Sequence, residues 1–434
     1  MKVRSWLSTT CSTSTSTAAS TASKHFYSDT TSTSDSSPPT SSFSSMSSLQ
    51  SNLSLQTLPS VPSLQKITPE SLNLSISYNS TASLKPNPNL HITSLSLHNN
   101  LLYTASNHII NVYDFTTWTL IHTFNANDSS SGSVKSVSFC NGKIFTAHQD
   151  SKIRVWKISP HVNNKEHRLV TVLPTVNDRL RKFILPKNYV NVRRHKKMLW
   201  IEHADAVTSL AVNKGLIYSV SWDKSLKIWR ASDLRCLESV KAHDDAINAV
   251  TVSPDGTVYT GSADCKIRVW AKPVNEKKHM LVATLEKHKS AVNALALNDD
   301  GSVLFSGACD RSILVWERED SANHMAVIGA LRGHGRAILS LVNVRDLLLS
   351  GSADRTVRIW QRGHDGKYCC LSVLEGHNKP VKSLAAVWEN GGDDGNNGVV
   401  SVFSGSLDGE IKAWKVSVFR HCSPVSPYQT LKIN

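Results

Sequence analysis

One string of fourteen residues recurs along most of this chain and constrains its fold more than any other feature. It is clearest at residues 347–360, LLLSGSADRTVRIW, where an apolar run, a polar turn and a second apolar run predict strand, tight turn and strand. Asp354 lies in the turn, where a short carboxylate can accept hydrogen bonds from backbone amides. Trp360 follows the acid by six residues.

The acid and the tryptophan recur with the same spacing in five more places: Asp150/Trp156, Asp223/Trp229, Asp264/Trp270, Asp310/Trp316 and Asp408/Trp414. A seventh, weaker copy has Asn107 and Tyr113 at these two positions. The chain is long enough for two or three ordinary domains, but a repeat array of this kind folds as one unit. We therefore expect one repeat domain with flanking tails.

Two further polar positions repeat in register with the acid and the tryptophan. A hydroxyl side chain stands four residues before the acid in the six clear copies: Thr146, Ser219, Thr260, Ser306, Ser350 and Ser404. Tyr103 takes that place in the weak copy. A histidine precedes an aliphatic strand start by four residues in five copies: His203, His243, His288, His334 and His377. The first two copies have Pro88 and Ser130 there instead.

These residues resemble the WD40 family, whose repeats of about 40 to 45 residues carry Gly-His near the start and Trp-Asp near the end. The resemblance covers roughly residues 88–416. It implies an all-β, seven-bladed β-propeller in which the His, Ser/Thr, Asp and Trp of a blade form a hydrogen-bonded network. Carried over here, the network would be complete in blades three to seven, would lack its histidine in blade two and would be nearly absent from blade one. We therefore expect blade one to be the loosest.

The N-terminal residues differ in composition from the repeats. Residues 1–66 are dominated by Ser and Thr, and Asp29 and Asp35 are the only acids before residue 60. Such a segment buries too little apolar surface to fold, so we predict a disordered tail. A plastid transit peptide has a similar composition, and this alternative stays open beside a phosphorylatable tail. Residues 67–434 are assigned to the propeller.

A closing strand is expected on the N-terminal side of blade one. Leu72, Leu74, Ile76 and Tyr78 alternate with polar residues, which predicts a strand. WD40 propellers are usually closed by an N-terminal strand that completes the last blade, and residues 72–84 are the natural candidate. The rival is the C-terminal segment 428–433; we prefer the N-terminal one.

The sequence contains no catalytic or metal-binding motif. The five histidines occur once per repeat, so a hydrogen bond within each blade explains all of them together. No metalloprotease, serine-hydrolase or P-loop string is found, and the Cys and His spacings match no zinc template. We therefore predict a protein that is not an enzyme, with no catalytic residue, metal site, cofactor or small-molecule substrate.

The cysteines and the lengths of the apolar runs indicate the cellular compartment of the protein. Eight cysteines are scattered without a Cys-x-x-Cys motif and no secretory segment follows the N-terminus, which favours reduced thiols in the cytoplasm or nucleus. No apolar run approaches the roughly 18 residues that a membrane span requires. We expect no membrane partner.

A basic insertion separates two of the repeats. Trp156 and Trp229 are 73 residues apart, about 30 more than neighbouring repeats. Residues 157–202 hold 11 Lys/Arg against 3 Asp/Glu, which is +8 of the chain's +14. Within residues 174–200, a capping-box-like start at Thr175, apolar residues at helical spacing and a stop at Pro186 predict a helix. The stretch 189–192 alternates like a strand and precedes a basic run: Arg193, Arg194, Lys196 and Lys197.

The string LPTVNDRLRKFILPKNYVNVRRHKKMLWIEHADAV at residues 173–207 resembles one that distinguishes plant WD40 proteins of the JINGUBANG type, and the Ser/Thr-rich head fits the same group. The resemblance implies a regulatory adaptor linked to pollen germination and to transcription factors. The basic run would then anchor an acidic partner or serve as a nuclear import signal. A solvated charged surface is the alternative.

Trp222 is a second candidate for partner binding. Only blade three places a large aromatic residue directly before its turn acid, and such residues are enriched in interaction hot spots. Packing against the neighbouring blade is the alternative. If residues 169–173 form the outer strand of blade two, the insertion emerges on the face that carries Trp222 and could flank it. If residues 189–192 form that strand, it emerges on the opposite face. We predict the first arrangement.

Three functional classes remain. A non-catalytic scaffold for protein–protein interaction is favoured, because the sequence supplies architecture without a reactive constellation. A substrate receptor of a cullin RING ubiquitin ligase usually carries Trp-Asp-x-Arg after a blade, and none of the repeats ends in that way. Nucleic-acid binding is suggested by a pI near 9.4, but bulk charge alone argues only for nonspecific attraction.

Overall fold

The computed structural model describes residues 61–64, 74–87, 89–161, 164–193, 196–273, 275–319, 325–363, 366–389 and 397–420. The chain divides after residue 60 into two units, and the second, Val61–Asn434, contains all of the described residues. Most of the expected tail, residues 1–66, and the rival closing segment, residues 428–433, lie outside the described residues. Residues 61–64 are described, and they contact the propeller.

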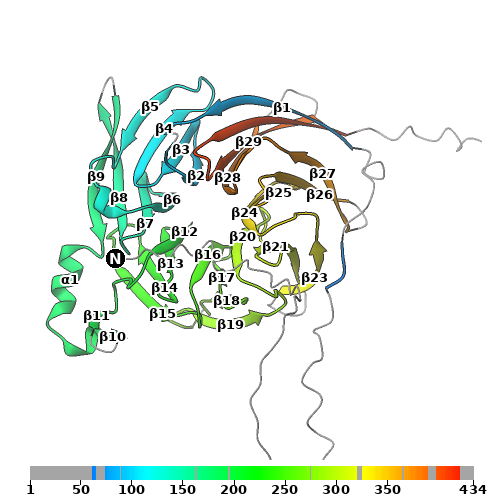
Figure 1. Ribbon diagram of the computed structural model, residues 1–434. Coiled ribbons are helices and arrows are strands. Elements are labelled where there is room, and N and C mark those ends of the chain that lie inside the picture. The colour runs from blue at the N-terminus through cyan, green and yellow to red at the C-terminus, as the bar shows by residue number, and fades with distance from the viewer. Residues whose placement is uncertain are drawn as a thin grey trace, which may run out of the picture. The chain divides into compact units, whose positions relative to one another are not determined.

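The described residues form a ring of seven four-stranded antiparallel sheets, which confirms the predicted seven-bladed β-propeller (Figure 1). Blade one consists of β2 (Ile92–His98), β3 (Leu101–Ser106), β4 (Ile109–Asp114) and β5 (Leu120–Phe124). After the short helix η3 (Ser129–Ser131), blade two consists of β6 (Val134–Cys140), β7 (Lys143–His148), β8 (Ile153–His161) and β9 (Asn164–Leu173). Blade three consists of β12 (Val207–Asn213), β13 (Leu216–Ser221), β14 (Ser225–Arg230) and β15 (Cys236–Lys241).

The next three blades repeat this meander, with the innermost strand first. Blade four consists of β16 (Ile247–Val252), β17 (Val258–Ser262), β18 (Ile267–Ala271) and β19 (Met280–Leu285). Blade five consists of β20 (Val292–Leu297), β21 (Val303–Ala308), β22 (Ile313–Arg318) and β23 (Met325–Leu331). Blade six consists of β24 (Ile338–Val344), β25 (Leu347–Ser352), β26 (Val357–Arg362) and β27 (Tyr368–Leu374).

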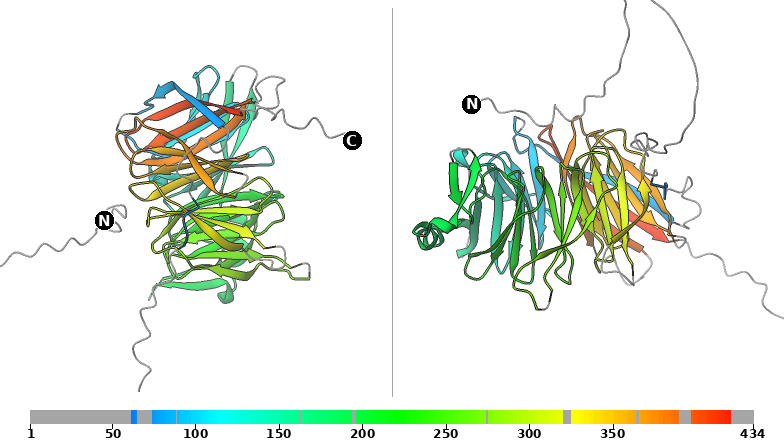
Figure 2. Two further views of the ribbon diagram at one scale, coloured as in Figure 1. Left: turned by 90° about the vertical axis from the view of Figure 1, so that its right-hand side faces the viewer. Right: turned by 90° about the horizontal axis from the view of Figure 1, so that it is seen from below.

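Blade seven joins strands from the two ends of the repeat region. It contains β28 (Val381–Glu389), β29 (Asn397–Ser406) and β30 (Ile411–Arg420), and its outer strand is β1 (Leu74–Leu84) (Figure 2). β1 pairs antiparallel with β30, with Tyr78 opposite Val416. The predicted N-terminal closing strand is therefore confirmed. Opening the ring requires breaking this pairing, and closure protects sheet edges that could otherwise recruit another chain.

The apolar core lies between adjacent blades, where the facing side chains of two sheets meet. All six residues of β25 are buried, which explains why this strand is continuously apolar or small rather than alternating. Its glycine, Gly351, faces the next blade: a Cβ there would lie 2.9 Å from Cγ1 of Val381. Gly405 faces Ile92 of blade one in the same way, at 2.5 Å. The repeated Ser-Gly-Ser string therefore permits close blade-to-blade packing.

The insertion forms a small substructure of its own. It contains α1 (Val176–Phe183), the short helix η4 (Pro186–Asn188) and the hairpin of β10 (Tyr189–Arg193) and β11 (Lys196–Leu199). Figures 1 and 2 show α1 at the outside of the ring rather than over its centre. Among the described residues, no helix has the length and the apolar composition needed to cross a membrane.

Candidate protein-interaction surface

A buried polar network joins the strands of blade six. Nε2 of His334 lies 2.8 Å from Oγ of Ser350, and the indole N–H of Trp360 donates to the same hydroxyl at 2.8 Å. Nδ1 of His334 lies 2.8 Å from Asp354, whose carboxylate also accepts the amide N–H of Gly335. Burial alone would raise the pKa of Asp354, but the hydrogen bond and the charge of His334 hold it well below its usual value.

The same contacts recur in the three preceding blades. The residues are His203, Ser219, Asp223 and Trp229 in blade three, His243, Thr260, Asp264 and Trp270 in blade four, and His288, Ser306, Asp310 and Trp316 in blade five. In each, both ring nitrogens of the histidine and the indole nitrogen are engaged within the blade. The repeated histidines and acids thus tie loops and turns together, and we assign them a scaffold role.

Blade seven contains the network of His377, Ser404, Asp408 and Trp414 in a modified form. Nε2 of His377 and the indole of Trp414 bind the hydroxyl of Ser404 at 2.8 and 3.0 Å. Nδ1 of His377 is 3.5 Å from Asp408, farther than in blade six. Two residues after this acid, Glu410 stands where blades three, five and six have a hydroxyl residue.

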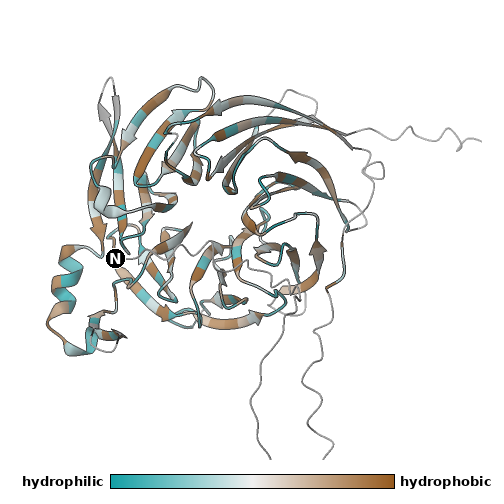
Figure 3. Cartoon of the chain, viewed as in Figure 1, coloured by the Kyte–Doolittle hydropathy of each residue, from teal (hydrophilic) through white to brown (hydrophobic). Residues whose placement is uncertain are grey.

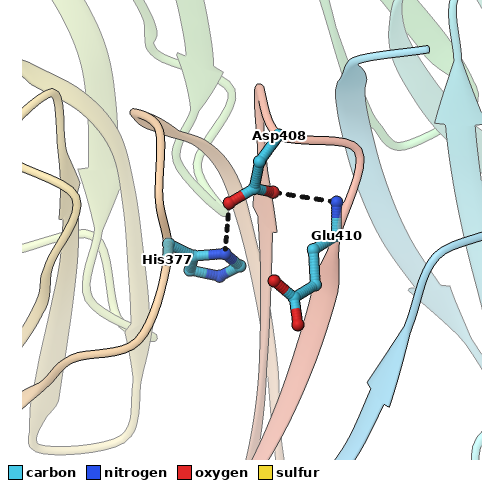
Figure 4. Close-up of side chains that lie close together, drawn as sticks. All are labelled: His377, Asp408 and Glu410. Atoms are coloured by element: carbon cyan, nitrogen blue, oxygen red, sulfur yellow. Dashed lines mark hydrogen bonds and ion pairs between the residues drawn. The ribbon is translucent and has the colours of Figure 1, made fainter. Parts of the chain in front are cut away.

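Figure 4 shows His377, Asp408 and Glu410 converging, and their potential ligand atoms lie within 4.8 Å of one another. Such a set could hold a metal ion. However, Nζ of Lys412 lies 3.0 Å from the Glu410 carboxylate, and Nζ of Lys85 lies 4.0 Å from it. These two ammonium groups already supply the positive charge that a cation would bring. We therefore assign the three residues to the polar network of the blade.

Blade two obtains its histidine from an unexpected position. Nε2 of His148, at the end of β7, lies 2.7 Å from the hydroxyl of Thr146, which also accepts the indole N–H of Trp156 at 2.9 Å. Asp150 pairs with Arg154 at 2.9 Å instead of with a histidine. His148 was not predicted, because the histidine of this blade was expected in the loop around Ser130, as in the other repeats. The sequence does carry a signal for this contact: His148 occupies the position of the second serine in the Ser-Gly-Ser string of other blades, such as Ser352 in blade six.

The protonation of His148 should make the stability of the protein depend on pH. Burial and the charge of Arg154 lower the pKa of His148 to about 3, whereas an unfolded histidine titrates at about 6.5. Its contribution to stability is therefore complete above pH 6.5 and is lost as the pH falls toward 3. Between pH 7 and pH 5 the wild type should lose about 2 kcal/mol more unfolding free energy than His148→Gln. Urea unfolding at both pH values measures this, and equal losses would contradict it.

Blade one departs from the expected alignment. The hydroxyl at the network position belongs to Thr104, which donates to the carbonyl of Asn111 at 3.4 Å, as Ser350 does to Arg358 at 3.5 Å. The assignment of Tyr103 to this position was wrong by one residue, because the turn between β3 and β4 is shorter than in the other blades. That blade one is the loosest stays a prediction.

Trp222 is half-buried at the turn between β13 and β14. Its backbone N–H donates to the carbonyl of Ala206 at 3.1 Å. Nζ of Lys135, from blade two, lies 5.8 Å from the centroid of its rings, within the range of a cation–π contact. The indole is therefore partly covered by the neighbouring blade and partly open.

Helix α1 of the insertion is fixed to the propeller by its polar face. The Oγ1 atom of Thr175 accepts the amide of Asp178 and begins the helix. Asp178 is only 5% exposed, and its carboxylate accepts the backbone N–H of Cys236 at the start of β15. The ammonium of Lys182 lies 5.3 Å from the ring centroid of Trp200. Arg179 pairs with Glu202 at 3.2 Å.

The apolar side chains of α1 face solvent. Val176, Leu180, Phe183 and Ile184 are 70%, 62%, 66% and 78% exposed. Their spacing of four, seven and eight residues places them on one face of the helix, opposite the docked side chains. Figure 3 shows hydrophilic and hydrophobic bands alternating along α1. A surface helix normally turns its apolar stripe toward the core, so this orientation is reversed. We call these four residues the α1 apolar face.

Basic side chains lie between α1 and the propeller and in the neighbouring hairpin. An open depression of about 380 Å³ between α1 and blade three is lined by Asp178, Arg181, Lys182, Arg230, Arg235, Cys236 and Leu237. The basic run lies at the turn of the β10–β11 hairpin, where Lys197 is exposed. Arg193 ends β10, Lys196 begins β11, and Arg194 lies outside the described residues.

Residues 169–173 belong to β9, the outer strand of blade two, as predicted. The insertion therefore leaves that blade at the end where the network turns lie. The predicted emergence of the insertion on the face that carries Trp222 is therefore confirmed. From there α1 extends to the start of β15, at the other end of blade three, where Asp178 anchors it. That the insertion flanks Trp222 stays a prediction.

Seven antiparallel blades, most of which contain the same His, hydroxyl and Trp contacts within the blade, define a propeller of the WD-repeat class. The family model described as WD domain, G-beta repeat matches residues 118–157, 196–230, 234–271, 280–317, 325–361 and 368–415. These segments make up more than half of the sequence. This chain belongs to the WD40 family.

Individual relatives are similar over a part of their length. "Mitochondrial division protein 1" of Schizosaccharomyces pombe is 29% identical over 134 residues, which cover 26% of this chain and 20% of that protein. "Protein ROOT INITIATION DEFECTIVE 3" of Arabidopsis thaliana is 27% identical over 149 residues, covering 33% and 34%. "Ribosome biogenesis protein WDR12 homolog" of Drosophila yakuba is 29% identical over 126 residues, covering 25% and 30%. This chain thus spans a fifth to about a third of the curated relatives it matches.

Proposed function

We propose that this protein is a non-catalytic scaffold whose propeller holds the α1 apolar face out as a docking surface for a partner protein. The observation that carries the proposal is the reversed helix: four apolar side chains, each at least 62% exposed, lie opposite a polar face that contacts the propeller. Clustered apolar side chains on a protein surface mark interaction sites. An amphipathic helix laid into an apolar groove is a recurrent mode of recognition.

The charges around α1 restrict the chemistry of the partner. Residues 157–202, which include the insertion, carry +8 of the chain's +14, and Arg181 within α1 and Lys187 just after it are exposed. A partner with an apolar groove bordered by Asp or Glu would complement both features. Complementary charge at the rim chiefly speeds association and excludes other partners, whereas the buried apolar anchors supply affinity.

We further propose a regulatory role in a plant, with transcription factors among the partners and with pollen germination or growth as the process. The string at residues 173–207 supports this assignment to the JINGUBANG type, since α1 and the hairpin lie within it. One of the relatives, "Protein ROOT INITIATION DEFECTIVE 3", is from the plant Arabidopsis thaliana, which is compatible with this assignment. Cytoplasm and nucleus are the compartments we propose. Quantitative affinity capture from pollen extract, with wild type and Leu180→Asp compared, tests both the surface and the pathway.

The basic run should contribute to location or to partner binding. Changing Arg193, Arg194, Lys196 and Lys197 to Gln should move a fluorescent fusion out of the nucleus or weaken partner capture, because import receptors and acidic partners both require these charges. The melting temperature should stay nearly unchanged. An unaltered distribution with unaltered capture would leave only a solvated charged surface. Trp222→Ala in the same capture assay tests whether this half-buried indole forms a second contact.

A further inference from the structure

Residues 61–64, which precede β1 in the sequence, lie in extended form along the outer edge of blade five. Ser63 forms a parallel bridge with Ala330 of β23. The N–H of Leu64 donates to the carbonyl of Ala330 at 3.0 Å, and the N–H of Ala330 donates to the carbonyl of Pro62 at 2.9 Å. Backbone groups on an outer strand are otherwise left to solvent or to another chain.

Both ends of this segment are held by further hydrogen bonds. The N–H of Tyr368, the first residue of β27 in blade six, donates to the carbonyl of Leu64 at 2.8 Å. Nη2 of Arg332 donates to the carbonyl of Val61 at 2.8 Å. The segment therefore lies in a groove formed by the outer strands of two adjacent blades.

Gly329 of β23 makes room for the leucine of the segment. A Cβ at this position would lie 2.3 Å from Cγ of Leu64, closer than atoms can approach. Leu64 is half-buried against an apolar cluster that includes Leu331 and Tyr368, and Val61 packs against the neighbouring cluster. Glycine weakens the interior of a strand, and its presence often marks a close approach by another backbone or by a ligand.

We propose that this edge of blades five and six is a peptide-recognition groove for an extended segment with a Pro-Ser-Leu core, and that residues 61–64 are its resident ligand. The mode is β-strand addition, in which backbone hydrogen bonds supply affinity and a pocket for one side chain supplies specificity. Leu64 precedes Leu74 of β1 by ten residues. Ten residues can span about 35 Å, so the segment of the same chain can reach the groove. The groove is separate from α1 and does not depend on its proposed role.

The sequence offers a matched control. The string Ser-Leu-Gln occurs at residues 63–65, where its first two residues lie in the groove, and again at residues 48–50 and 54–56. Leu55 therefore has the same neighbours on both sides as Leu64, but it lies outside the described residues. Leu64→Asp removes the side chain that Gly329 accommodates. Leu55→Asp makes the same change in charge but leaves Leu64 in place.

The test measures binding of a fluorescein-labelled peptide of residues 58–66, LPSVPSLQK, to full-length chains by anisotropy. Leu64→Asp should bind it at least about 10-fold more tightly than wild type or Leu55→Asp, because a tethered ligand competes at an effective concentration of about millimolar. Adding Gly329→Ala to the Leu64→Asp chain should abolish the binding, since the new methyl group fills the place of the leucine. A peptide in which the leucine matching Leu64 is Asp should not bind.

Equal affinity of the peptide for wild type and Leu64→Asp would overturn the proposal. The proposal would also be overturned if the peptide still bound the Leu64→Asp chain after Gly329→Ala was added, or if the Asp peptide bound as tightly as the unaltered peptide. The Asp peptide needs no change in the protein, so the test holds even where a variant fails to fold. Wild type that elutes as a dimer, with Leu64→Asp as a monomer, would show that the resident ligand comes from a second copy, contrary to the proposal.

Discussion

Replacing His334 or Asp354 with alanine should destabilise the propeller by about 1 to 3 kcal/mol each. His334→Ala removes the histidine that contacts Asp354. The ionised form of the Asp354 carboxyl is stabilised by this contact, since burial alone would raise its pKa. Asp354→Ala removes the carboxylate that contacts Nδ1 of the buried histidine and accepts the amide N–H of Gly335. Because each change breaks the same network, the double variant should lose less than the sum of the two. Denaturant unfolding of the four proteins measures the coupling.

The same set of single and double variants in blade seven provides an internal comparison of the coupling energy. His377 and Asp408 are 3.5 Å apart, against 2.8 Å for the pair in blade six. The coupling energy of the blade-seven pair should therefore be smaller. Additive losses in blade six would show that His334 and Asp354 do not act as a unit. Equal coupling in the two blades would show that the distance between the groups does not set its size.

Leu180→Asp and Phe183→Asp should each weaken partner binding by about 2 kcal/mol or more, as expected for central apolar anchors of an interface. Both side chains are more than 60% exposed, so unfolding free energies should change by no more than about 0.5 kcal/mol. Leu120→Asp is the matched control, because Leu120 is 54% exposed on β5 of blade one, away from the insertion. Titration of the purified partner recovered by capture measures the three affinities.

The opposite pattern would contradict the proposed role of α1. If Leu180→Asp lowered the melting temperature while partner affinity was preserved, the helix would be part of the folded core. If Leu120→Asp weakened binding as much as Leu180→Asp, the loss would reflect added negative charge rather than the α1 apolar face.

The architecture could be predicted from the sequence because every repeat encodes it locally. Alternating apolar residues and the turn acids specify one meander, and the Asp-to-Trp spacing fixes the register of the middle strands. The start of α1 was predictable for the same reason, since Thr175 is a local capping signal. In blade one the hydroxyl position was assigned to Tyr103 instead of Thr104, because the turn between β3 and β4 is shorter than in the other blades. The spacing of residues in the sequence does not reveal such a change in turn length.

Features that depend on contacts between distant residues could not be predicted. The helical pattern of α1 does not say which face touches the protein; the bond from the amide of Cys236 to Asp178 decides that. The docking of residues 61–64 rests on backbone hydrogen bonds to a strand more than 260 residues away, which leave little trace in side-chain patterns. His148 contacts Thr146 from the same strand, whereas the histidines of blades three to seven contact their hydroxyl from a loop, so the repeat pattern did not predict it.

Amide hydrogen exchange of the full chain, alone and with the captured partner, tests the central claim most directly. Exchange in an amphipathic helix slows when its outward face is covered and its opening is suppressed. The docking role of α1 predicts that residues 176–185 gain protection on binding, while the turn around Trp222 changes little. Protection confined to that turn, with α1 exchanging as fast as in the free protein, would contradict it.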